Sequence, residues 1–108
     1  MITDVKSFIN TLKHIKNKDS KLICIMYSSR FGVINVFMYG NVTFIKTSYL
    51  SVNHLSVRQL VSKLINLNAD NNFILLRVDG ETEVINTIQE DRGYTIIKVE
   101  LLNSSIGN

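Results

Sequence analysis

The chain has 108 residues, of which 45 % are apolar, and a net charge of +3. This length suits a single domain, residues 1–108, with one hydrophobic core. No apolar run approaches the ~20 residues of a membrane-spanning helix, and the N-terminal MITDVKSFIN lacks the layout of a signal peptide. The only cysteine, Cys24, excludes an internal disulfide bond, so we expect a cytoplasmic protein without membrane contact.

The first half of the chain predicts one helix followed by three strands. Apolar residues at helical spacing favour a helix over residues 4–17, for which Asp4 is a suitable N-cap. The run at 21–28 is apolar on both faces, which is typical of a central strand. Gly40-Asn41 is a two-residue hairpin signal. The strands that flank it are expected at 32–39 and 42–49.

The second half predicts the same order again. Ser56 and Gln59 form a capping box at the start of a helix that ends near residue 68. Asp79-Gly80 is a second hairpin signal. Strands are expected at 73–78, 82–88 and 94–102, and a frayed tail at 103–108. Short connections between these elements favour antiparallel pairing. The order αβββ-αβββ therefore predicts an α+β fold, with a mostly antiparallel sheet of five or six strands, centred on 22–27 and 73–78, and two helices packed on one face.

A shift of 52 residues lays residues 55–102 over residues 3–50, with six of 48 aligned positions identical. The apolar stripes of the two predicted helices coincide, as do the two N-cap residues Asp4 and Ser56. YTIIKVELL at 94–102 falls on VTFIKTSYL at 42–50, and the two share Thr, Ile, Lys and Leu. Such self-similarity predicts an internal repeat of one supersecondary unit.

No residue pattern indicates catalysis or a cofactor. Cys24 and the two histidines are not at metal-ligand spacing, and the glycines do not form a phosphate-binding loop. A nuclease core of the E…D…E-x-K type needs an acid on the second or third strand, and residues 32–49 contain none. We interpret Asp79, Glu81 and Glu83 as an exposed hairpin tip, although alternation along a strand would place them on one face. The expectation is a non-enzymatic protein with no metal or cofactor.

Charge is divided unevenly along the chain. Residues 1–69 carry nine Lys and Arg against two acids, whereas residues 70–108 carry three against seven. This division favours attraction between copies or to another protein. The first hypothesis is therefore a protein-interaction or scaffold module that works as a homo-oligomer, a dimer first, through an unpaired strand edge at 42–49 or 94–102. In the latter strand the edge residues would be Tyr94, Ile96, Lys98 and Glu100.

The second hypothesis is a small nucleic-acid-binding protein. Basic residues gather in and after the first predicted helix, and Phe31, Tyr39 and Tyr49 would stack on bases. Acids of the C-terminal half would repel phosphate wherever they came near, which ranks this hypothesis second. The candidate contacts are Lys6, Lys13, Lys16, Lys18, Lys21 and Arg30. An enzyme with an active site shared between subunits is the third alternative.

Residues 32–102 combine an apolar strand, a short turn, a second strand, a long amphipathic helix and a hairpin that ends in an apolar strand. The segments are VINVFMY, Gly40-Asn41, VTFIKTSY, residues 56–68, FILLRVDGETEVI and RGYTIIKVELL. This order resembles the Roadblock/dynein-light-chain family of small αβ domains. The resemblance implies a dimer with a continuous sheet and a role as a scaffold or regulator of small GTPases. It assigns no functional residue.

Overall fold

The computed structural model describes residues 1–49 and 53–100 of the chain. These residues form two helices and seven strands, with three strands after the first helix and four after the second. Their bounds are α1 Val5–Lys13, β1 Lys21–Met26, β2 Ser29–Tyr39, β3 Val42–Tyr49, α2 Val57–Leu67, β4 Phe73–Val78, β5 Glu81–Glu83, β6 Ile85–Asp91 and β7 Tyr94–Val99.

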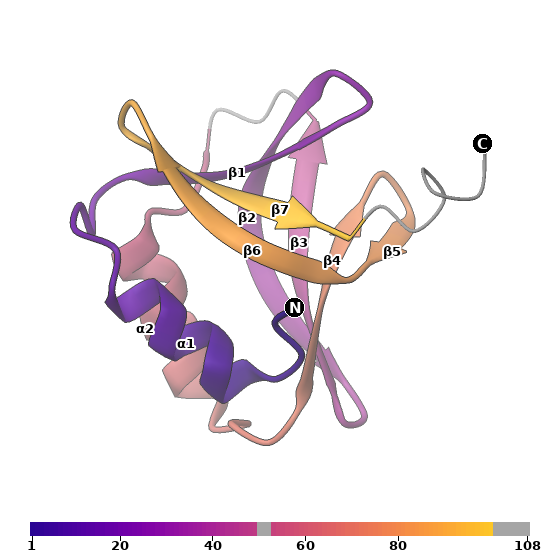
Figure 1. Cartoon of the computed structure of the whole chain (residues 1–108). Helices are drawn as coiled ribbons and strands as arrows, with labels where there is room; N and C mark the ends of the chain where they lie inside the picture. Colours follow the sequence, from indigo (N-terminus) through magenta and orange to yellow (C-terminus); the bar gives the residue numbers. More distant parts are fainter. Residues whose placement is uncertain (50–52, 101–108) are drawn as a thin grey trace.

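The strands form one mixed sheet with the order β5-β4-β3-β2-β1-β7-β6. Neighbouring strands are antiparallel except for two parallel pairs, β1 with β7 and β3 with β4. The second pair is parallel because α2 carries the chain back to the end of the sheet at which β3 began. The sheet curls into a half-barrel (Figure 1). Its two ends, β5 and β6, are separated along the chain by Val84 alone.

The α+β class is confirmed, but the predicted sheet of five or six mostly antiparallel strands, with the helices packed on one face of it, is wrong, because the two helices lie in the hollow of a curled, mixed sheet. The sheet has seven strands, mixed directions and a strong curl. It is centred on β2, and β4 lies next to the three-residue strand β5. The strands expected at an edge, β3 and β7, both lie inside the sheet. Short connections suggested hairpins, but two of the pairings join strands that are distant in the chain. Residues 101–102 and the predicted tail lie outside the described residues.

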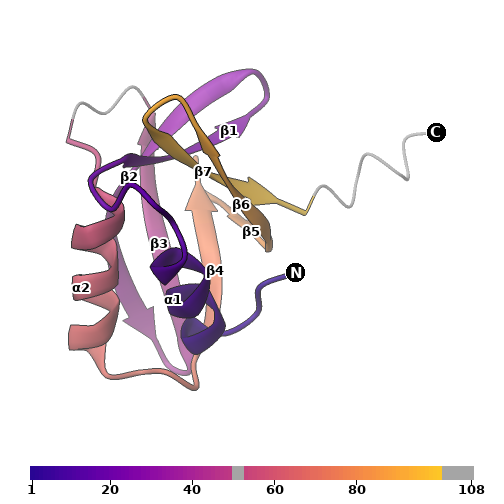
Figure 2. The same ribbon diagram turned by 60° about the vertical axis from the view of Figure 1, so that its left-hand side comes forward.

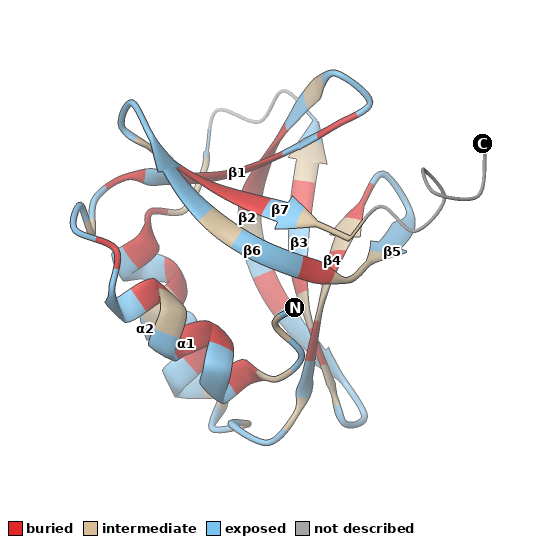
Figure 3. Cartoon of the chain, viewed as in Figure 1, coloured by how far each residue is buried: buried red, intermediate tan, exposed pale blue. Residues whose placement is uncertain are grey.

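The two helices lie side by side against the inner face of the curled sheet (Figures 1 and 2). Their apolar stripes are buried together with the inward-facing strand residues in one core (Figure 3). Burying one large apolar side chain contributes about 1.5–3 kcal/mol to the free energy of unfolding. The core between the helices and the inner face of the sheet is therefore the main source of stability. The fully buried members include Val5, Phe8, Leu12, Ile45, Val57, Leu60, Leu64, Leu76 and Ile97.

Both predicted helix starts are confirmed. The Asp4 carboxylate accepts a hydrogen bond of 2.8 Å from the Ser7 N–H. Ser56 and Gln59 make both hydrogen bonds of the capping box. At the other end of α2, Asn68 adopts φ 53°, the left-handed conformation that commonly ends a helix.

The elements of residues 5–49 recur 52 residues later in the chain. The helices begin at Val5 and Val57, and the strands β3 and β7 begin at Val42 and Tyr94. β4 is the counterpart of β1, and β2 has its counterpart in β5 and β6 together. Even the bulge of β2, between Val33 and Asn35, recurs between Ile85 and Thr87.

Contacts between the two halves come in pairs related by the same shift. The Val5 N–H donates to the Asn72 carbonyl oxygen and the Val57 N–H to the Ser20 carbonyl oxygen, both at 3.0 Å. The isolated bridge between Asp4 and Phe73 is matched by the bridge between Ser56 and Lys21. The halves are therefore arranged about a pseudo-two-fold axis. Residues 52 positions apart occupy equivalent places in the fold, and we call them counterparts.

Candidate functional site

A groove of about 610 Å³ opens on the outer face of β2, β3 and β4, the face turned away from the core. Alternation along β3 defines this face, because Ile45 is buried whereas Lys46 is exposed. We call the hollow the aromatic groove. Its lining consists of Phe31, Asn35, Phe37, Lys46, Thr47, Ser48, Tyr49, Arg77, Asp79 and Gly80.

Two cations lie next to each other in this groove. Lys46 of β3 and Arg77 of β4 are paired in register across the parallel strands. Arg77 Nη1 donates a hydrogen bond of 2.7 Å to Thr82 Oγ1. Within the described part of the chain, neither cation forms an ion pair with a carboxylate. Because like charges on neighbouring strands repel each other, an anion bound between them would stabilise this arrangement.

A pair of stacked aromatic rings adjoins the two cations. Phe37 and Phe44 face each other across β2 and β3, with ring centroids 5.1 Å apart and ring planes 18° apart. Phe37 keeps 41 % of its surface exposed. The next row of the sheet pairs Asn35 with Lys46. The groove thus places a flat apolar surface beside positive charge and a side-chain amide.

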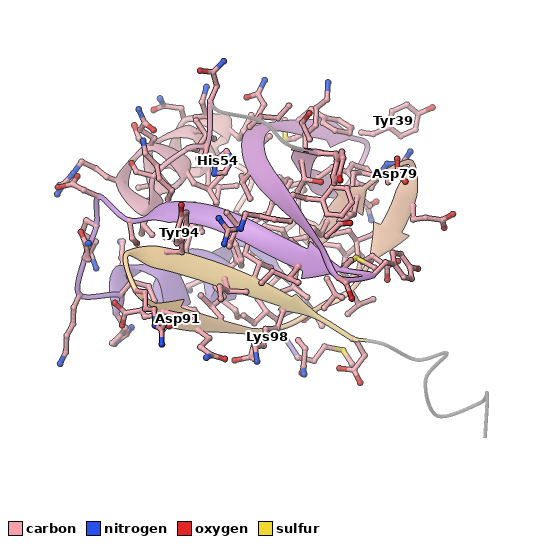
Figure 4. All side chains as sticks on the ribbon, turned by 90° about the horizontal axis from the view of Figure 1, so that it is seen from above. Tyr39, His54, Asp79, Asp91, Tyr94 and Lys98 are labelled. Carbon is pink, nitrogen blue, oxygen red and sulfur yellow. The ribbon has the colours of Figure 1, made fainter. Side chains whose placement is uncertain are left out.

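The other half of the fold contains an equivalent hollow with different side chains. This aliphatic groove, of about 360 Å³, is lined by Ile25, Gln89, Ile96, Ile97, Lys98 and Val99. The two grooves share no lining residue, and in Figure 4 Lys98 lies at the lower edge of the view whereas Asp79 lies at the upper right.

A comparison of counterpart residues shows which side chains of the aromatic groove recur in the other half of the fold and which do not. Lys98 is the counterpart of Lys46, so both grooves keep one lysine. The counterpart of Arg77 is Ile25, that of Phe37 is Gln89, and that of Phe44 is Ile96. The same fold position thus accepts glutamine in place of an exposed phenylalanine. The second cation and the stacked rings are therefore additions that the fold itself does not need.

The basic residues expected to form one binding cluster are dispersed. Lys6 and Lys13 line a hollow between α1 and α2, together with Asp70. The Lys18 ammonium donates to the carbonyl oxygens of Lys13 and Ile15, which satisfies acceptors at the end of α1. This cation therefore stabilises the helix terminus.

The remaining three predicted cations lie elsewhere. Lys16 is exposed, and its backbone N–H donates to the Glu90 carboxylate at 3.2 Å. Lys21 is exposed at the start of β1. The Arg30 guanidinium lies 4.8 Å from the centre of the Tyr94 ring, as in a cation–π contact.

The residues predicted to form an oligomer edge do not lie at an edge. Tyr94, Ile96 and Lys98 belong to β7, which pairs with β1 on one side and β6 on the other. Glu100 follows this strand, and its N–H donates to the Val84 carbonyl oxygen at 2.8 Å. The backbone edges of the sheet are β5 and β6 instead.

Two buried or half-buried titratable groups have shifted pKa values. Burial raises the pKa of the Cys24 thiol to about 12, so the nucleophilic thiolate is strongly disfavoured. Burial, followed by the charge of Glu81, raises the pKa of Glu83. In residues 1–49 and 53–100, His, Cys, Asp and Glu side chains do not gather in a group of three that could hold a metal ion.

Neither α1 nor α2 has the length and apolar composition needed to cross a bilayer. Comparisons with models of known protein families, with curated proteins and with solved structures found no match to this chain.

Proposed function

We propose that this protein binds single-stranded nucleic acid in the aromatic groove. The observation that carries the proposal is the placement of Lys46 and Arg77 beside the stacked pair of Phe37 and Phe44. Single-strand binding surfaces combine cations that follow the phosphates with aromatic rings on which bases stack. Asn35 and Ser48 supply hydrogen-bonding groups to the same groove.

The acids of the C-terminal half, which argue against phosphate binding in the sequence, are mostly directed elsewhere in the fold. Asp91 lies at the end of β6, on the opposite side of the molecule from Asp79 (Figure 4). Glu81 and Glu83 flank Thr82, the register partner of Arg77. Because successive side chains of a strand point to opposite faces of the sheet, Thr82 shares the face of Arg77 and both carboxylates point to the other face. Among the described acids, only Asp79 lines the groove.

A second candidate is a protein-interaction module that forms a homodimer through the same face. The observation that favours it is the exposed apolar end of this face, where Tyr39 and Phe73 are 81 % and 55 % exposed. Exposed aromatic side chains are typical of protein interfaces. Such a dimer would use this face rather than strand-edge pairing, since β3 and β7 lie inside the sheet.

Fluorescence anisotropy with labelled single strands of about 12 nucleotides, DNA and RNA of mixed sequence, tests the first proposal. The decisive variant is Lys46→Glu, and its matched control is Lys98→Glu, which makes the same charge change at the counterpart position. We expect Lys46→Glu to weaken binding roughly tenfold and to flatten the dependence of log K on log salt by about 0.7 for each phosphate that the variant no longer neutralises. Lys98→Glu should bind much more like the wild type.

Equal decreases in affinity in the two variants would show that binding follows net charge and not the aromatic groove. An absence of binding by the wild-type protein at low salt would overturn the proposal altogether. Unfolding curves of both variants, measured in parallel, separate a direct effect on binding from an effect on folding.

A further inference from the structure

We infer that Tyr27 and Tyr49 form a second stacking platform, so that the aromatic groove holds a segment of several nucleotides with a base at each end. This inference rests on the proposed function and extends it. The phosphates between the two bases would lie over Lys46 and Arg77, midway along the groove.

The second platform lies where β3 ends and the β1–β2 hairpin turns. Tyr27, Ser29, Phe31, Tyr49 and Asp79 line a hollow of about 250 Å³ that shares three of its residues with the aromatic groove. The Tyr49 ring is 5.5 Å from the Phe31 ring and 56 % exposed, and Tyr27 is 79 % exposed. Phenol rings with this exposure have free faces on which a base can stack.

The spacing of the two platforms sets the size of the ligand. Phe44 and Tyr49 lie on one strand, five residues apart, and although alternation assigns an odd separation to opposite faces, Tyr49 at the end of the strand lines the aromatic groove. At about 3.3 Å per residue, this separation is about 17 Å. One nucleotide cannot cover that length, whereas a short single-stranded segment can.

The backbone at Tyr27 supplies independent support. Tyr27 and Ser28 have φ values of 51° and 63°, a left-handed conformation that is unfavourable for both residue types. Their counterparts, Asp79 and Gly80, make the equivalent turn with φ values of 51° and 80° and with the residues that such turns prefer. An exposed tyrosine thus remains at a strained position where the fold accepts Asp-Gly. Strain of this kind concentrates at functional sites.

The test replaces the strained turn with its counterpart. The double variant Tyr27→Asp, Ser28→Gly should raise the melting temperature, because it relieves the strain, and should weaken binding of the single strand about fivefold or more. Ser28→Gly alone is the matched control, since it relieves strain but keeps the ring. It should raise the melting temperature and leave affinity unchanged. Tyr49→Ser removes the second ring without altering the turn and should also weaken binding.

The outcomes separate this inference from the proposed function. If the double variant and Tyr49→Ser both bind like the wild type while Lys46→Glu binds weakly, the second platform does not exist but the proposed function stands. If the wild type binds no single strand, both proposals are overturned. If the double variant binds weakly but melts below the wild type, its weak binding reflects damage to the fold, and Tyr49→Ser becomes the test of the second platform. Unchanged affinity in Tyr49→Ser then overturns the inference.

Discussion

Lys46 and Arg77 are direct neighbours on two parallel strands, and no described carboxylate forms an ion pair with either of them. In the other half of the fold the same two positions hold Lys98 and Ile25. The second positive charge is thus specific to one groove. Since the packing of the repeat does not demand Arg77, binding of an anion gives a physical reason for its presence.

The stacked phenylalanines give the first prediction. Phe37→Ser should weaken binding of a single strand about fivefold or more, because a base loses its stacking surface. Gln89→Ser, at the counterpart position, should leave affinity unchanged. Anisotropy titrations measure both. Since Phe37 is already 41 % exposed, its replacement should lower the melting temperature only modestly. Unchanged affinity in Phe37→Ser would show that the stacked rings of Phe37 and Phe44 do not take part in binding.

The second prediction is that the contributions of the two helix caps, Asp4 and Ser56, to the free energy of unfolding depend differently on pH. Asp4→Ala and Ser56→Ala should each lower the free energy of unfolding by about 1 kcal/mol near neutral pH. The hydrogen bond from the Ser7 N–H lowers the pKa of Asp4 below its ordinary value of 3.8. The stability that this carboxylate contributes is complete above that value and is lost as pH falls through the lowered pKa.

Urea unfolding at neutral pH and below pH 3.8 measures this effect. The deficit of Asp4→Ala should shrink in acid, while the deficit of Ser56→Ala stays constant because a serine hydroxyl does not titrate. A constant deficit in both variants would contradict the assignment of the Asp4 carboxylate as the cap.

A third prediction concerns Gly32, whose outer side is covered by the ring of His54. A β-carbon at Gly32 would lie 2.2 Å from His54 Cδ2. Gly32→Ala should therefore destabilise the protein by about 1–3 kcal/mol. Adding His54→Ala should recover most of this stability, which a double-mutant cycle of unfolding free energies measures. Additive effects would show that the alanine disturbs another neighbour.

Local signals in the sequence predicted much of the secondary structure. The caps at Asp4 and Ser56 and the turns at Gly40-Asn41 and Asp79-Gly80 are each encoded within a few residues, and the structure has all four. The end of α1 was less predictable. The apolar stripe continues to Ile15, but the helix ends at Lys13, and the ammonium of Lys18, which follows the helix in the chain, caps its carbonyl oxygens.

The sheet order and the groove could not be predicted in the same way. The parallel pairing of β1 with β7 joins segments from opposite ends of the chain, and no local pattern encodes it. Arg77 lies within the apolar run FILLRV, which suggested a buried central strand, and Lys46 lies on a strand expected at an edge. Only the parallel register of β3 and β4 brings the two side chains together. The sequence offered two signals for the groove: the opposition of Phe37 and Phe44 across the Gly40-Asn41 turn, and the rings of Phe31 and Tyr49, which were expected to stack on bases and do line the groove.

Size-exclusion chromatography with light scattering tests the central claim most directly, with and without a single strand of about 12 nucleotides at low and moderate salt. We predict a monomer of 12.3 kDa that forms a complex with the strand. The complex should weaken with added salt, and Lys46→Glu should weaken it roughly tenfold while Lys98→Glu leaves it much as in the wild type. A stable dimer that ignores the oligonucleotide at every salt concentration would contradict this account and favour an interface between copies on the same face.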